Sequence, residues 1–436
     1  MKNRIVKILS VALAACTIAG TASGCSKSTG NQGAASVKHS ITWYSSRPVD
    51  GAIEQTVKEI AEQYKQKVDK DFSLNIETTS DRPSYLQKLK TLVASNQMPD
   101  IIDTDADPYA KELVNKGLLV DVKKYLNDKG LYSKYYPIAL KYQEFSDGTM
   151  YTLPLEYHVE MTWYNKNIFK KYNVSVPKTL DDLLKACATL KKNGVTPISV
   201  DGVDRWPVLR YTAMVPFRLT GNQYILNLRE GKASMKDDAG EKALTFTKEI
   251  GTYFNQGFES TDYATAQSMF LQGKSAMYYI GDWEIAAMLD EYKKGNIDYF
   301  YLPTTDGATT KPNEFCVNSG IGMAFNQKTF NSVEPFITYL INNYGKLYSE
   351  KQQMSPIKTD LADTGTQYSD LYKRIKSDMD KTGDNFLKPW DTYFDPDTLS
   401  VFEDNVLLVA DGRMSTDSFA DLIDSKIKVN APKYFK

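Results

Sequence analysis

The chain has 436 residues, of which 42% are hydrophobic and 25% charged, which suits two or three globular domains of roughly 100–200 residues each. Its 53 Lys and Arg against 54 Asp and Glu give a formal net charge of −1, which excludes long disorder and a strongly basic nucleic-acid surface. Only two His and four Cys are present, so little material exists for metal or thiol chemistry.

The N-terminus has the pattern of a secretory signal. A basic start precedes an apolar run at residues 8–19, and small residues then lead to Cys25. The last four of these residues, Ala-Ser-Gly-Cys, resemble a bacterial lipobox, in which the Cys is lipidated after cleavage, although Ala22 stands where that pattern prefers Leu. We expect a signal peptide at 1–24 and a lipidated Cys25 at the head of a flexible tether, 25–37. An ordinary signal peptide cut nearby is the alternative.

Predicted strands and helices alternate at the start of the mature chain. Strand patterns cover residues 41–44, 72–76 and 99–103, and apolar residues recur at helical steps over 53–68 and 85–93. This β-α-β-α-β order predicts a parallel sheet with helices on both faces.

The carboxyl ends of the first and third predicted strands are candidate ligand sites. Ligands of such sheets bind beyond the carboxyl ends of the strands, which here means residues 45–50 and 103–107. The candidate ligand-binding residues of this region are Tyr44, Ser46, Arg47, Asp103 and Asp105.

The pattern changes after the turn at residues 147–148. Two extended segments, 150–154 and 159–164, the first of which ends at Pro154, indicate a crossing between two lobes. A second α/β region then reaches about residue 303. Its first predicted helix is 180–192, with Thr179 as the N-cap, and later helices are predicted at 333–348, 399–409 and 422–427.

A strand-like stretch of small residues at 318–322 indicates that the chain returns to the first lobe. Asn318, at its start, is a further candidate ligand-binding residue.

Two cysteines remain once Cys16 leaves with the signal and Cys25 takes the lipid. We expect Cys187 and Cys316 to be buried as small apolar side chains, with a single disulfide between them as the alternative.

No pattern for metal-dependent or covalent catalysis is complete. Residues 103–107 begin like a calcium loop, but Pro108 and Val114 stand where the Gly and the bidentate Glu belong. Glu156 and Glu160 lie four apart on an extended segment, and a carboxylate pair is what a glycoside hydrolase uses. We expect no catalytic residue, metal or cofactor, and keep the hydrolase as an alternative.

Three tryptophans lie beside polar residues that favour loops, namely Trp206, Trp283 and Trp390. An aromatic ring can cover the flat C–H face of a sugar, which is worth roughly 1.5 kcal/mol for about 60 Å² removed from water. Several such rings favour a carbohydrate site that holds more than one sugar unit.

Seven short blocks follow one another in a specific order behind the lipobox. They lie at residues 85–89, 98–102, 147–154, 164–166, 177–183, 269–277 and 281–283, the last being Gly-Asp-Trp. In this order they resemble extracellular solute-binding protein family 1, the sugar-binding lipoproteins of ABC importers that include maltose-binding protein. The resemblance covers nearly the whole mature chain.

The resemblance implies a fold and a set of site residues. The fold is the two-lobed, type II periplasmic-binding-protein-like α/β fold, each lobe a mainly parallel sheet flanked by helices, with the ligand cleft between the lobes. Trp283 matches the stacking Trp of the family, and Asp282 matches a hydroxyl ligand. His158 stands where maltose-binding protein has an acidic sugar ligand, so we expect Glu156 to supply that charge.

We assign residues 38–153 and 318–375 to lobe 1 and residues 154–317 and 376–436 to lobe 2. The predicted protein is an extracellular, lipid-anchored receptor that captures a carbohydrate, expected to be an oligosaccharide, and delivers it to the permease of an ABC transporter. It is expected to be a monomer with no enzymatic activity and no nucleic-acid partner. The alternatives are a surface glycoside hydrolase and a binding protein for a non-sugar solute.

Overall fold

The computed structural model describes residues 39–48, 50–145, 147–383 and 385–435. The predicted signal peptide, the tether and the lipidation of Cys25 lie outside these residues and stay predictions. None of the described helices combines the length and the apolar character that crossing a bilayer requires.

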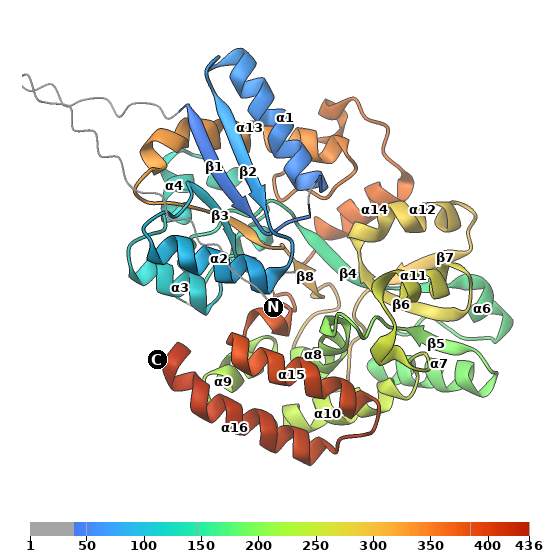
Figure 1. Ribbon diagram of the computed structural model, residues 1–436. Coiled ribbons are helices and arrows are strands. Elements are labelled where there is room, and N and C mark those ends of the chain that lie inside the picture. The colour runs from blue at the N-terminus through green and yellow to red at the C-terminus, as the bar shows by residue number, and fades with distance from the viewer. Residues whose placement is uncertain (1–38, 49, 146, 384, 436) are drawn as a thin grey trace, which may run out of the picture. The chain divides into compact units, whose positions relative to one another are not determined.

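The first sheet has the strand order β2-β1-β3-β9 (Figure 1). Its strands are β1 (Ser40–Ser45), β2 (Ser73–Thr78), β3 (Ile101–Thr104) and β9 (Gly322–Phe325). β1 is parallel to β2 and to β3, which confirms the arrangement predicted from the alternating pattern. β9 is antiparallel to β3 and confirms the predicted return of the chain.

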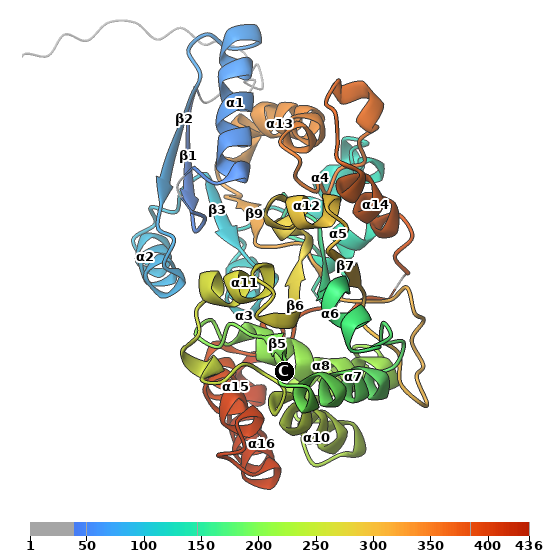
Figure 2. The same ribbon diagram turned by 90° about the vertical axis from the view of Figure 1, so that its right-hand side faces the viewer.

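Helices cover both faces of this sheet, as predicted (Figure 2). The helices near it are α1 (Ala52–Lys67), α2 (Arg82–Ala94), α3 (Pro108–Asn115), α4 (Val122–Asp128), α5 (Pro137–Tyr142) and α13 (Phe330–Glu350). Because side chains alternate along a strand, Trp43 and Ile101 pack with α1 and α13, whereas Tyr44 and Ile102 pack with α2 and α3.

The second sheet has the order β5-β6-β4-β7, and β8 pairs with β4 outside this path. Its strands are β4 (His158–Asn165), β5 (Thr196–Ser199), β6 (Ser275–Gly281), β7 (Ile297–Phe300) and β8 (Val317–Asn318). β5 and β6 are parallel, but β4 is antiparallel to both β6 and β7. The expected mainly parallel sheet is therefore interrupted by one reversed strand.

The reversed strands share a cause. β9 is the first strand after the chain crosses from the second sheet to the first, and β4 is the first strand after it crosses from the first sheet to the second. The first residues of each strand pair with the last residues of its neighbour. Thr104 at the end of β3 pairs with Gly322 at the start of β9, and Gly281 at the end of β6 pairs with Glu160 near the start of β4. Both crossings therefore reach the strand ends at which ligands bind in such folds.

A large hydrophobic core surrounds the second sheet. The helices that contribute to it or lie beside it are α6 (Lys166–Lys171), α7 (Leu180–Lys192), α8 (Trp206–Thr220), α9 (Gln223–Arg229), α10 (Asp238–Gly251), α11 (Tyr263–Leu271), α12 (Ile285–Lys293), α14 (Asp370–Met379), α15 (Pro396–Ala410) and α16 (Thr416–Tyr434). α7 has the predicted bounds, and Thr179 and Asp182 form a reciprocal capping box at its start.

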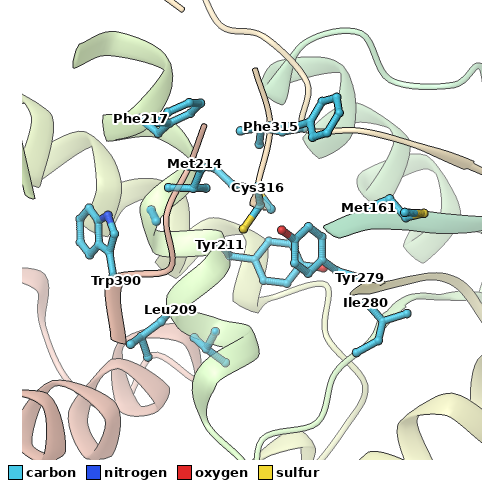
Figure 3. Packing of buried hydrophobic residues seen from close by; sticks show 14 of the residues in the cluster. Met161, Leu209, Tyr211, Met214, Phe217, Tyr279, Ile280, Phe315, Cys316 and Trp390 are labelled. Carbon is cyan, nitrogen blue, oxygen red and sulfur yellow. The ribbon is translucent and has the colours of Figure 1, made fainter. Parts of the chain in front are cut away.

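Cys187 and Cys316 are free and buried in this core, which confirms the expected apolar role and excludes the disulfide alternative. Figure 3 shows the sulfur of Cys316 beside the rings of Tyr211 and Tyr279. Trp390 lies in the same core, 2% exposed.

Two predicted strand segments are not formed as expected. The stretch 318–322 divides into the end of β8 and the start of β9, with residues 319–321 outside both strands. Residues 150–154 make only an isolated bridge between Leu153 and Met323. Pro154 explains this, because it has no N–H with which to continue a ladder. The proposed lobe boundaries stay a prediction. Leu371 and Ile375, in the segment assigned to lobe 1, pack in the core of the second sheet.

Candidate functional site

Two chain segments cross between the sheets side by side. Leu153 pairs with Met323 at one end of these crossings, and His158 pairs with Asn318 at the other. The side chain of Leu155 packs with the first core, and Tyr157 packs with the second. Side chains at the crossings can therefore contact residues of both sheets.

Five ionisable side chains form a continuous chain at this place, here called the ionic chain. In spatial order they are Asp103, Arg47, Glu156, His158 and Asp282. The Arg47 guanidinium lies 3.4 Å from Asp103 Oδ2 and 3.4 Å from Glu156 Oε1. The His158 ring lies 3.1 Å from Glu156 Oε2 and 3.2 Å from Asp282 Oδ2. Its members alternate in charge when ionised.

Asp103 anchors the ionic chain to the first sheet. Its carboxylate accepts hydrogen bonds from Trp43 Nε1 at 2.9 Å, from Ser45 Oγ at 3.1 Å and from the backbone N–H of Ser46 at 2.9 Å. Arg47 also donates a hydrogen bond to the backbone carbonyl of Ile321, in the segment that leads back to the first sheet. The carboxyl ends of β1 and β3 thus hold one end of the ionic chain.

The charges of the chain stabilise one another. Burial alone would raise the pKa of Glu156, but the hydrogen bond and charge of His158, with Arg47, lower it to about 2. Burial likewise opposes the charged form of His158, yet Asp282 and Glu156 raise its pKa to about 10. Both groups are therefore ionised at neutral pH. Burial alone would lower the pKa of Arg47, but the charges of Asp103 and Glu156 outweigh this effect. The pKa of Arg47 therefore lies above its ordinary value.

Asp282 holds the other end of the ionic chain on the second sheet. It follows β6 directly and begins the short 3-10 helix η3 (Asp282–Glu284). Its buried carboxylate contacts the His158 ring and accepts a hydrogen bond of 2.8 Å from the backbone N–H of Val159. The expected role of Asp282 as a hydroxyl ligand stays a prediction, and in this structure its oxygens contact the His158 ring.

Trp283 lies beside the ionic chain and is partly exposed. Its ring meets the His158 ring edge-on at 5.5 Å between centroids, and its Nε1 donates to the hydroxyl of Tyr263 at 2.9 Å. A Cβ on Gly281 would lie 2.0 Å from the Trp283 ring, so the ring occupies space that only glycine leaves open.

Trp206, at the start of α8, is the second partly exposed indole ring. Its ring centroid lies 6.3 Å from that of Trp283. The guanidinium of Arg210 covers it at 4.9 Å. Arg210 is itself held by Glu160 at 2.9 Å and by Asp391 at 2.6 Å. Glu160 therefore binds a different cation from Glu156.

A small pocket lies next to Trp206. Its walls are Ser199, Val200, Asp201, Trp206, Pro207, Tyr211, Tyr263, Tyr278, Tyr279 and Ile280. Burial raises the pKa of Asp201 to about 6. Among the residues that the structure describes, the buried Oδ2 of Asp201 and the hydroxyls of Tyr211 and Tyr278 have no hydrogen-bond partner.

The structure brings nine of the twelve predicted site residues together, whereas Tyr44 and Trp390 lie in the cores and Asp105 lies just beyond β3. The ionic chain, Ser46, Asn318, Trp283 and Trp206 form one group by the contacts above. Tyr44 stacks on Tyr85 in the core beside α2, at 4.5 Å between centroids. Trp390 packs against Tyr224 and Phe402.

Asp105 follows β3 and is half-buried. Burial lowers the pKa of Lys388, and the charge of Asp105 opposes this effect.

Sequence reasoning did not identify Arg210 or Tyr263. Arg210 follows Trp206 by four residues on one helix, a spacing that places the two side chains on the same face, so this contact was detectable. The contact between Tyr263 and Trp283 joins different elements, and no local pattern signals it.

A model of the bacterial extracellular solute-binding protein family matches residues 50–347. An uncharacterized ABC transporter extracellular-binding protein of Pyrococcus horikoshii is 26% identical over 222 residues, 50% of each chain. The multiple sugar-binding protein of Streptococcus mutans is 24% identical over 293 residues, 63% of this chain and 67% of that protein. The chain thus spans about half the length of the first of these relatives and two thirds of the second.

Solved structures share the fold. A structure from work on xylan utilization by the thermophilic bacterium Caldanaerobius polysaccharolyticus has a TM-score of 0.72 at 25% identity, and covers 89% of this chain and 100% of that one. A chitin oligosaccharide binding protein has a TM-score of 0.75 at 20% identity, over 90% of this chain and 99% of that one.

Proposed function

We propose that this chain, which belongs to the bacterial extracellular solute-binding protein family, is the receptor of an ABC importer and captures a carbohydrate, specifically an oligosaccharide. The observation that carries the proposal is the pair of partly exposed rings, Trp206 and Trp283, beside the ionic chain. The relative named for binding multiple sugars supports the ligand class.

The ligand is proposed to lie against Trp283, Trp206, Glu156, Asn318 and Asp105. Two stacked sugar faces supply roughly 3 kcal/mol at about 25 cal/mol per Å². Micromolar affinity needs about 8 kcal/mol, so hydrogen bonds to the carboxylates must supply the rest, at roughly 1.5–3 kcal/mol for each bond to a charged group. Arg47, His158, Asp103 and Asp282 would hold Glu156 and Trp283 in place.

The ionic chain suits a receptor that closes around its ligand. A ligand closes a two-lobed protein only if it binds the closed form better, which it does by contacting both lobes. Arg47 is anchored to the first sheet through Asp103, and His158 is anchored to the second through Asp282. A sugar bound to Glu156 would therefore contact a group that is tied to both sheets.

A lipid on Cys25 would hold the receptor at the extracellular face of the membrane, near the permease subunits that receive the sugar. The protein would act as a monomer and without catalysis.

Intrinsic fluorescence tests the ligand class. Trp43, Trp163 and Trp390 are buried in the cores, so a ligand-dependent signal should come from Trp206 and Trp283. Titration with a panel of mono- and oligosaccharides should give a saturable change at micromolar sugar, followed by calorimetry on each hit. In a Trp206→Phe/Trp283→Phe variant the fluorescence change should vanish, while calorimetry still detects binding to the retained aromatic rings.

Two results would overturn the proposal. One is the absence of any response from folded protein across the panel, which would favour a non-sugar solute. The other is the appearance of shorter products when the protein is incubated with its best oligosaccharide, which would identify a hydrolase.

A further inference from the structure

The cations of the ionic chain are already bonded to carboxylates of the protein. Arg47 lies between Asp103 and Glu156, at 3.4 Å from each. His158 lies between Glu156 and Asp282, and both of its ring nitrogens are engaged. Both cations thus already face carboxylates of the protein, although Arg47 Nε, 3.4 Å from Asp103 Oδ2, makes no hydrogen bond within the described residues.

Two further buried cations, Arg210 and Lys388, are engaged as well. Arg210 bonds to Glu160 and to Asp391, and is 3% exposed. The amine of Lys388 donates a hydrogen bond of 2.8 Å to the carbonyl of Tyr142. Burial lowers the pKa of Lys388 to about 8, although Asp105 acts in the opposite direction.

The balance of charge at this place is negative. The four cations just described stand beside six carboxylates, Asp103, Glu156, Asp282, Glu160, Asp391 and Asp105, so the sum is −2 when all are ionised. Asp201, beside Trp206, and Glu284, which accepts hydrogen bonds from Tyr263 and Gln267, add to the excess.

We propose that this site accepts uncharged or cationic sugars and rejects sugars that carry a carboxylate, sulfate or phosphate group. The inference rests on the proposed function and narrows its ligand class. An anionic group that binds beside Glu156 would have to take Arg47 or His158 from it, which would leave that carboxylate buried without a partner. A sugar hydroxyl instead donates to Glu156 and leaves both pairs intact.

A matched pair of ligands tests the inference on the unmodified protein. The first ligand is the best neutral oligosaccharide from the panel, and the second is the same oligosaccharide with one terminal hydroxymethyl group oxidised to a uronic acid. Calorimetry at pH 7 should show the acidic ligand binding weaker by about tenfold or more. Equal affinities, or a preference for the acidic ligand, would overturn the inference while leaving the proposed function intact. Absence of binding by any neutral sugar would instead overturn the proposed function.

A Glu156→Gln variant tests the cause. Gln keeps the shape of the side chain but removes the charge shared by Arg47 and His158, so the acidic ligand should gain affinity relative to the neutral one by about tenfold. Glu112→Gln is the matched control, because Glu112 is exposed on α3 and pairs only with Lys116 among the salt bridges of the described residues. An unchanged ratio in folded Glu156→Gln protein would show that Glu156 does not set the charge preference. Circular dichroism establishes that the variant is folded, and the ligand pair on the unmodified protein decides the inference in either case.

Discussion

The guanidinium of Arg210 lies 4.9 Å from the centre of the Trp206 ring and covers one of its faces. Arg210 is fixed by carboxylates from two other parts of the chain, Glu160 on β4 and Asp391 in the 3-10 helix η5 (Trp390–Thr392). Trp206 stands at the first position of α8, after Arg205 with a φ of 65°. One face of the ring is therefore covered by a side chain one helical turn away, which is held by carboxylates outside α8.

Arg210→Met should lower the free energy of unfolding by about 3–5 kcal/mol, because it leaves the fully buried Glu160 without its cation. Urea unfolding measures this change. A Glu160→Gln/Arg210→Met double variant should recover part of the loss. Arg413→Met is the surface control, since Arg413 pairs with Glu259 and Asp411 at a half-exposed position and should cost less than about 1 kcal/mol. If Arg210→Met and Arg413→Met lower the free energy of unfolding by similar amounts, the buried pair of Arg210 and Glu160 does not stabilise the fold as expected.

Trp283→Ala should weaken oligosaccharide binding by at least about 1 kcal/mol and leave the fold intact, because the partly exposed ring is the proposed stacking surface. Trp390→Phe is the comparison: it should lower the melting temperature and leave affinity unchanged, since Trp390 packs against Tyr224 and Phe402. Calorimetry and thermal unfolding separate the two effects. A weaker affinity in Trp390→Phe would return Trp390 to the site.

The two tryptophans also show how far the sequence could predict the site. Both stand beside Asp and loop-forming residues, so their local patterns are alike. Their exposure differs because helix α15 brings Phe402 against Trp390, and no local pattern reports that contact. The elements up to β3 were predictable because their spacing is local, whereas the direction of β4 depends on its pairing with the distant β6.

The ionic chain illustrates the same limit. Each of its members was a candidate from its position at a strand end or from the family pattern. The sequence did not indicate that Arg47 and His158 would occupy the carboxylates expected to bind the ligand, because that depends on how both crossings run beside each other. Residue identities were thus predictable, and their mutual bonding was not.

Cys25→Ala should release the protein from the membrane fraction, because the predicted lipid is attached to this residue. Fractionation of cells, with immunoblotting, measures the distribution. Cys187→Ala is the control and should stay with the membrane, since Cys187 is buried in the core. Continued lipid labelling of Cys25→Ala would refute the anchor.

Protein that begins at residue 26 should hide both of its thiols while folded. Burial raises the pKa of Cys187 and of Cys316, and neither thiol is exposed, so a thiol reagent should label neither. Unfolding in denaturant should expose both, with or without a reductant. A thiol count that rises only after reduction would indicate a disulfide and contradict the structure.

Stability should depend on pH in opposite directions at the two ends of the range, because Glu156 and His158 are shifted oppositely. The folded pKa of Glu156, about 2, lies below its ordinary value of 4.5, so its contribution is complete above pH 4.5 and is lost as the pH falls toward 2. The folded pKa of His158, about 10, lies above its ordinary value of 6.5, so its contribution is complete below pH 6.5 and is lost as the pH rises toward 10.

The two groups together stabilise the fold most between about pH 4.5 and 6.5. Urea unfolding at a series of pH values measures the profile, and a His158→Gln variant isolates the alkaline limb. In that variant the loss between pH 6.5 and 10 should shrink, because Gln does not titrate. His39→Gln is the control: His39 is 57% exposed and pairs with Asp69 away from the ionic chain, so its replacement should leave the alkaline limb in place. If His158→Gln and the unmodified protein lose stability in parallel above pH 6.5, the imidazolium between Glu156 and Asp282 is not what holds this part of the fold.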